Sequence, residues 1–183
     1  MDIQAEVRKK AEAAKAASYK LGTLSTKVKN EALLAMAHAL EQRSSMILTA
    51  NAQDLEEARQ KGVKRSYLDR LMLDENRIAG MAEGLRQTAA LPDPIGQGDY
   101  SCVRPNGLSI RRVRVPLGVV GIIYEARPNV TADALALCLK SGNAVLLRGG
   151  SEAIRSNIAI SSLLAEEAYK HGIPAGAIQF IDF

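Results

Sequence analysis

The sequence predicts an α/β protein with a helical N-terminal block, a β-hairpin, and then half of a doubly wound parallel sheet. Three observations lead to this fold class. Apolar residues recur at helical spacing through residues 1–91. Asn106-Gly107 separates two strand-like runs. From Pro116 onwards, short apolar runs alternate with amphipathic segments, as in a βαβαβ unit.

Composition narrows the possible functions. The 183 residues carry 24 basic and 20 acidic side chains, a formal net charge of +4, which fits either a solvated surface or an anionic ligand. Aromatic residues are scarce, which disfavours stacking on nucleic acid. No apolar run reaches the roughly 20 residues of a membrane span, and the N-terminus has no signal-peptide core. We therefore expect a cytoplasmic protein that binds neither membrane nor nucleic acid.

The helical block is expected to form a domain of residues 1–98. Its first helix is predicted to stop at Gly22, and prolines 92 and 94 end the series. Polar residues whose side chains can accept hydrogen bonds from backbone N–H groups are predicted to begin the later helices. They are Ser25 or Thr26, Asn51 (followed by Asp54 at the third helical position) and Asp74.

Residues 99–115 are predicted to form a β-hairpin that contributes to oligomerisation. Asn106 and Gly107 both tolerate positive φ, so the sequence favours a type I′ turn. Strand alternation would place Arg112 and Arg114 on one face of the ribbon. This basic face is either a charged strand surface, an oligomer contact or the only support for a nucleic-acid binder.

Residues 116–183 are predicted to form the half-sheet, with three apolar strands buried on both faces. The strands are expected at Val119–Tyr124, Ala144–Arg148 and Ala177–Ile181, with helices between them. No third crossover follows the last strand, so we expect a truncated version of the fold.

Ligands of open α/β sheets bind beyond the carboxyl ends of the strands, so the residues there are the first candidates for a site. Asn129 is either the N-cap of the next helix or an amide donor to an oxyanion. Arg127 either binds a phosphate or carboxylate or neutralises Glu125. Arg148 is a cation beside two glycines that allow close backbone approach. No metal-ligand cluster and no nucleophile–His arrangement is visible.

Four stretches of the sequence carry a specific resemblance. PLGVVGIIYEARPNVTADALALCLKSGNAVLLRGGSEA resembles the signature region of the gamma-glutamyl phosphate reductases, members of the aldehyde dehydrogenase superfamily. ILTANAQDLEEAR, LDRLML and GIPAGAIQFID are also similar to stretches of that family, so the resemblance covers the whole chain. It implies a Rossmann-like, aldehyde dehydrogenase-like sheet.

The resemblance implies an enzyme of proline biosynthesis that reduces L-glutamyl 5-phosphate with NADPH to glutamate 5-semialdehyde, NADP and phosphate. It implies a homo-oligomer and an association with glutamate 5-kinase. Asn129 would be the oxyanion donor, and Arg127 with Glu125 would bind substrate. The cofactor would be bound by five consecutive residues, in which the arginine suits a 2′-phosphate and Ser151 or Glu152 approaches the ribose: Arg148, Gly149, Gly150, Ser151 and Glu152.

The chain departs from the family in length. The superfamily's nucleophile is a cysteine, and neither Cys102 nor Cys138 matches its position. We therefore expect that this chain alone has no reductase activity. The alternative hypothesis is a non-catalytic nucleotide-binding or assembly module that retains the half-fold.

Overall fold

The computed structural model describes residues 2–183, and its first half consists of helices. Ser25 Oγ accepts from Val28 N at the start of the second helix, and Asp74 Oδ1 accepts from Arg77 N at the start of the fifth, so these predicted caps are confirmed. The helices are α1 (Ile3–Leu21), α2 (Thr26–Gln42), α3 (Ser44–Gln60), α4 (Arg65–Leu71) and α5 (Glu75–Ala90).

The prediction that Asn51 begins a helix is wrong. Only Arg43 separates α2 from α3, so Asn51 lies in the middle of α3, where it is buried. The reason is tertiary, because Asn51 Nδ2 donates to Leu71 O at the end of α4 and Asn51 Oδ1 accepts from Leu73 N just beyond it.

The hairpin forms as predicted from strands β1 (Gly98–Val103) and β2 (Ser109–Val113), paired antiparallel. The predicted type I′ turn is wrong. No non-glycine residue among those described has positive φ, and only Gly107 in the turn does, at 85°. Gly107 N donates to Arg104 O over 2.8 Å. Pro105 favours this type I turn because its ring fixes φ at the second position, and Gly107 then supplies the left-handed residue.

The second half is the predicted βαβαβ unit, with a parallel sheet of order β3-β4-β5. Burial on both faces holds for the central strand but is wrong for β3, whose Ile123 is 88% exposed. Among residues 2–183, the strand β3 pairs only with β4, so it lies at the edge of this sheet. The elements are β3 (Val119–Ile123), α6 (Asn129–Lys140), β4 (Ala144–Arg148), the 3₁₀ turn η1 (Ser151–Ala153), α7 (Ile154–Lys170) and β5 (Ile178–Phe180).

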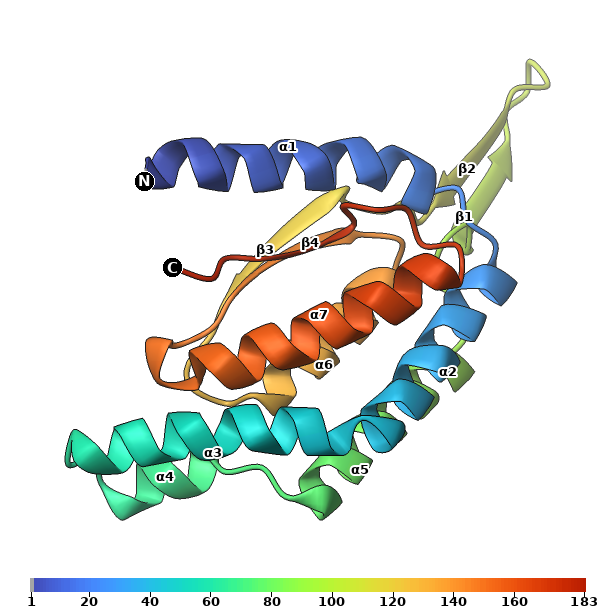
Figure 1. Cartoon of the computed structure of the whole chain (residues 1–183). Coiled ribbons are helices and arrows are strands. Elements are labelled where there is room, and N and C mark those ends of the chain that lie inside the picture. The colour runs from blue at the N-terminus through green and yellow to red at the C-terminus, as the bar shows by residue number, and fades with distance from the viewer. Residues whose placement is uncertain (1) are drawn as a thin grey trace.

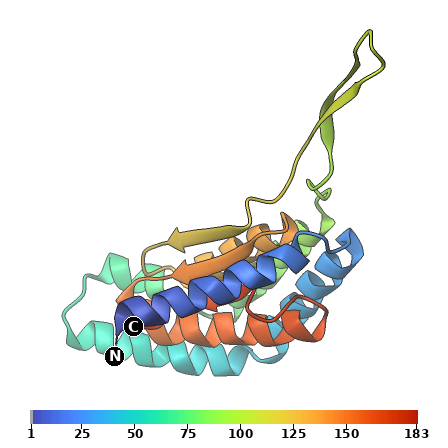
Figure 2. The same cartoon turned by 90° about the horizontal axis from the view of Figure 1, so that it is seen from above.

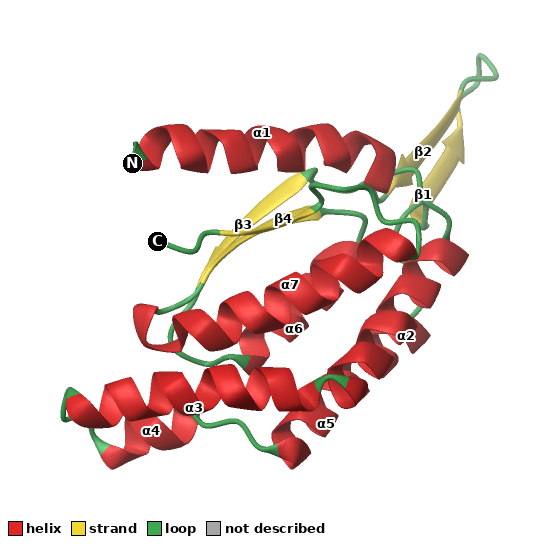
Figure 3. Cartoon of the chain, viewed as in Figure 1, coloured by secondary structure: helices red, strands yellow, loops and turns green. Residues whose placement is uncertain are grey.

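The elements stack in layers around the parallel sheet (Figures 1 and 3). The helix α1 covers one face, and Lys10 Nζ on it donates to Phe180 O at the end of β5 over 2.8 Å. The helices α6 and α7 cover the other face, and α2, α3 and α5 pack outside them. One apolar core runs through these layers. The hairpin projects away from this body (Figure 2).

Candidate functional site

The loops that follow β3 and β4 touch at the carboxyl edge of the sheet. A methyl group on Gly150 would lie 3.0 Å from Ala126 N and 3.2 Å from Glu152 Oε2. It would also lie 3.3 Å from the carbonyl carbon of Glu125. The structure therefore brings Glu125, predicted to bind substrate, next to Gly150 and Glu152, predicted to bind the cofactor.

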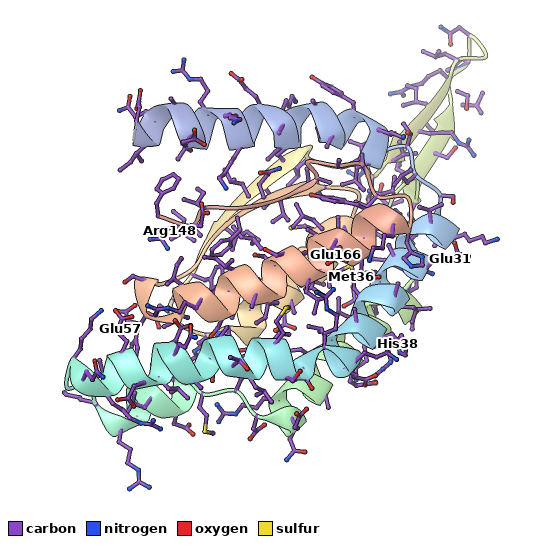
Figure 4. All side chains as sticks on the ribbon, viewed as in Figure 1. Glu31, Met36, His38, Glu57, Arg148 and Glu166 are labelled. Atoms are coloured by element: carbon purple, nitrogen blue, oxygen red, sulfur yellow. The ribbon has the colours of Figure 1, made fainter. Side chains whose placement is uncertain are left out.

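Arg148 ends β4 at this edge and is half-buried (Figure 4). Its guanidinium donates to the carbonyl oxygen of Gly149. It forms no ion pair with any carboxylate of residues 2–183. A half-buried guanidinium without a carboxylate partner is suited to binding an anion such as a phosphate.

Gly149 is enclosed by side chains rather than open to solvent. A methyl group there would lie 2.2 Å from Asn157 Nδ2 and 3.1 Å from the Tyr124 ring. Asn157 is fully buried, and its Oδ1 accepts from Thr131 Oγ1 over 3.0 Å. Its Nδ2 has no partner within the described chain. Close packing is therefore one physical reason for the glycine that the sequence could not reveal.

Tyr124 completes this buried group. Its hydroxyl lies 2.5 Å from Thr131 Oγ1, and burial raises the pKa of Tyr124 to about 12. The neutral phenol thus anchors the loop after β3 to α6. Arg148, which has no ion-pair partner, and the small Gly149-Gly150 turn fit a phosphate-bearing dinucleotide at this edge.

Arg127 and Asn129 also follow β3 but line a separate pocket of about 500 Å³ among α4, α5 and the start of α6. Arg148 does not line this pocket. Its polar lining comes from three elements and one loop: Asp69, Arg70, Arg77, Arg127, Asn129 and Asp133. Of these, only Arg127 and Asn129 are predicted from the sequence. The others come from helices read as packing elements, and no local signal marks them.

Asn129 is the first residue of α6, and Pro128 occupies the N-cap position. No side chain caps this helix, so the N-cap interpretation of Asn129 is wrong. Its exposed amide Nδ2 lies 3.5 Å from Asp133 Oδ2. The side chain is thus free to donate to a ligand in the pocket.

A buried network fixes the start of α7, and sequence reasoning missed it. Asp54 Oδ2, on α3, accepts from Ser156 N over 2.8 Å and from Ser156 Oγ over 2.7 Å. Asn51 Nδ2 donates to the same Ser156 Oγ over 3.0 Å. An acidic side chain stabilises the positive N-terminal end of a helix. Asp54 thereby holds η1 and the turn after Arg148 in place.

Other kinds of site find little support in the described residues. Cys102 is half-buried in the hairpin, and burial raises the pKa of Cys138 to about 11, so the Cys138 thiol is not activated as a nucleophile. Between residues 2 and 183 no three His, Cys, Asp or Glu side chains gather as a metal ion requires. None of the helices described is both long and apolar enough to span a membrane.

Comparison with known proteins gives consistent matches along the whole chain. The model of the aldehyde dehydrogenase family matches residues 2–182. A gamma-glutamyl phosphate reductase of Caldanaerobacter subterraneus is 59% identical over 97% of this chain and 43% of its own length. One from Heliobacterium modesticaldum is 59% identical over 100% of this chain and 44% of its own length.

Solved structures agree. The crystal structure of gamma-glutamyl phosphate reductase from Thermotoga maritima superposes with a TM-score of 0.95 at 45% identity, over 97% of this chain and 43% of that one. The crystal structure of gamma-glutamyl phosphate reductase from Saccharomyces cerevisiae superposes with a TM-score of 0.88 at 31% identity, over 95% of this chain and 45% of that one. The chain therefore spans less than half the length of the relatives it matches.

Proposed function

The chain belongs to the aldehyde dehydrogenase family, and from this premise we propose that it serves the NADPH-dependent reduction of L-glutamyl 5-phosphate to glutamate 5-semialdehyde, with release of phosphate, in proline biosynthesis. The observation that carries the proposal is the 59% identity to gamma-glutamyl phosphate reductases across nearly the whole chain. The two-part carboxyl edge supports it, because one part suits a dinucleotide and the other a small charged molecule.

The cofactor is assigned to the β4 side of the edge. Arg148 would bind the 2′-phosphate that distinguishes NADPH from NADH. Ser151 would approach the ribose, while Glu152 lies close to Tyr67, whose pKa burial and the Glu152 charge both raise. Gly149 and Gly150 keep the turn small beside the bound group. When bound, NADPH would supply the hydride.

The reacting carbonyl is assigned to the β3 side. Asn129 would donate its amide to the developing oxyanion, a contact that strengthens as negative charge accumulates on the oxygen. Arg127 and Glu125, on the same loop, would bind and orient the substrate. Neither cysteine of this chain is assigned as the nucleophile, because Cys138 is buried and Cys102 lies on the hairpin.

A chimera tests the proposal. This chain replaces the matching N-terminal part of the Caldanaerobacter relative, and phosphate-dependent reduction of NADP⁺ by glutamate 5-semialdehyde is measured. We expect activity from the chimera and none from the 183-residue chain alone. Cys102→Ser and Cys138→Ser in the chimera should leave activity intact. A chimera that folds but has no activity would contradict the proposal, as would loss of activity with either serine variant.

The hairpin is assigned to contacts between copies of the chain. Large apolar side chains are exposed along and beside it: Tyr100, Val103, Leu108, Ile110, Val113 and Val115. We also propose association with glutamate 5-kinase in the cytoplasm, because that enzyme would deliver the reactive acyl phosphate. Sedimentation of the chimera before and after Val103→Asp and Ile110→Asp tests the hairpin contact.

A further inference from the structure

The pocket that contains Arg127 and Asn129 offers charges of both signs that the protein itself does not pair. Arg77 is committed to the protein, because it donates to Met72 O over 2.7 Å and to Asp69 Oδ1 over 3.2 Å. Arg70 and Arg127 form no ion pair and no side-chain hydrogen bond with any of residues 2–183. Two guanidinium groups in this pocket are therefore available to an anion.

The same pocket holds an unpaired carboxylate. Asp133 lies one helical turn beyond Asn129 on α6, and its only partner in the described chain is the Asn129 amide at 3.5 Å. No Lys or Arg of residues 2–183 reaches it as an ion pair. An ammonium group is the ligand that such a carboxylate would take, because the charged hydrogen bond replaces the water lost on burial.

The start of α6 adds a third feature. Its N-cap is Pro128, which has no side-chain acceptor, and no other side chain caps the helix. Val130 N and Thr131 N donate to the carbonyl oxygens of Arg127 and Pro128, but no side chain offsets the positive end of this twelve-residue helix, whose first residue, Asn129, lines the pocket. Together with Arg70 and Arg127, it favours a carboxylate at one end, while Asp133 favours a cation at the other.

We propose that this pocket binds the α-amino acid end of the substrate, with Arg70 and Arg127 on the α-carboxylate and Asp133 on the α-ammonium group. The assignment rests on the proposed function, because glutamyl phosphate carries both charges on one carbon atom. The acyl phosphate end fits less well, since Asp133 and Asp69 would repel a dianion. Arg70 and Asp133 thereby become specificity-determining residues.

NMR titration of the 183-residue chain tests the assignment. The probes are L-glutamate, glutarate (which lacks the ammonium group), 4-aminobutyrate (which lacks the α-carboxylate) and inorganic phosphate. We expect glutamate to shift the amide signals of Asn129 and Asp133 and to bind roughly 10-fold more tightly than glutarate or 4-aminobutyrate, as expected from one charged hydrogen bond.

Variants sharpen the test. Arg70→Gln should weaken glutamate binding roughly 10-fold, so that glutamate no longer binds more tightly than 4-aminobutyrate. Asp133→Asn should weaken glutamate binding but leave the affinity for glutarate unchanged. Arg65→Gln is the matched control, because Arg65 is an exposed arginine on α4 outside the pocket, and it should change nothing.

The outcomes separate this inference from the proposed function. Unchanged glutamate affinity in Arg70→Gln, or phosphate binding more tightly than glutamate, overturns the head-group assignment. If NADPH shifts signals around Arg148 while glutamate shifts none, the assignment is also overturned and the proposed function stands. If glutamate binds as expected but the chimera has no activity, the proposed function alone fails.

Discussion

Substitution of Gly149 by alanine should destabilise the fold through one contact. The added methyl would lie 2.2 Å from Asn157 Nδ2, whereas ordinary van der Waals contact begins at 3.4 Å. The atoms must therefore separate by about 1.2 Å. Asn157 cannot move away, because it is fully buried and hydrogen-bonded to Thr131. Gly149 does not have positive φ, so backbone strain adds nothing.

The expected cost follows from overpacking. Forcing an extra methyl into a packed interior costs about 1–3 kcal/mol, less about 0.4–1 kcal/mol because alanine restricts the unfolded chain. We expect Gly149→Ala to lower the free energy of unfolding by about 1–2 kcal/mol in urea titrations. Gly121→Ala is the control, because a methyl there meets nothing within 4 Å.

A double-mutant cycle identifies the cause. In an Asn157→Ala background the space beside Gly149 is open, so Gly149→Ala should cost at least 1 kcal/mol less than in the parent, allowing about 0.5 kcal/mol for residual contact with Tyr124. Additive effects within about 0.5 kcal/mol would refute this reasoning. So would a Gly149→Ala variant that is as stable as Gly121→Ala.

Three further predictions concern charge and chemistry. In the chimera, Asn129→Ala should lower turnover by roughly 10²–10³-fold with little change in KM, and a near-normal rate would remove the oxyanion role. In fluorescence titrations, Arg148→Ala should weaken NADPH binding roughly 10-fold and NADH binding hardly at all. Equal effects on the two cofactors would exclude a 2′-phosphate contact. Hydrogen bonds from Lys61 and Arg155 lower the pKa of the Glu57 carboxyl to about 2, so its stabilising contribution is present above the ordinary value of 4.5 and is lost as the pH falls from there to about 2. Carboxyl NMR titration should find that midpoint and see it rise in Lys61→Gln, and an unchanged midpoint would contradict the pairing.

Local patterns predicted the elements of this fold well. The βαβαβ alternation, the hairpin and the Asp74 cap depend on residues within a few positions of one another. The sequence also located the carboxyl edge of the sheet, because each apolar strand ends in polar residues.

Local patterns failed where a partner lies far along the chain. Asn51 and Asp54 have the spacing of a helix start, yet both are mid-helix and bind Ser156, over 100 positions away. Arg70 and Asp133 are ordinary helix-surface residues in the sequence and come to line one pocket only through the packing of α4 against α3 and of α5 against α6. Packing at Gly149 was equally invisible, because Asn157 approaches it from the next helix.

The position of α1 across the sheet bears on the order of assembly during synthesis. Its buried residues Ala14 and Leu21 pack in a core shared with β4 and β5, and Lys10 binds a carbonyl 170 positions away. At typical ribosomal rates of about 5–20 residues per second, α1 waits on the order of ten to thirty seconds for that surface to emerge. The helix α1 thus cannot dock until β4 and β5 have been made, and its apolar stripe is a natural target for chaperones in that interval.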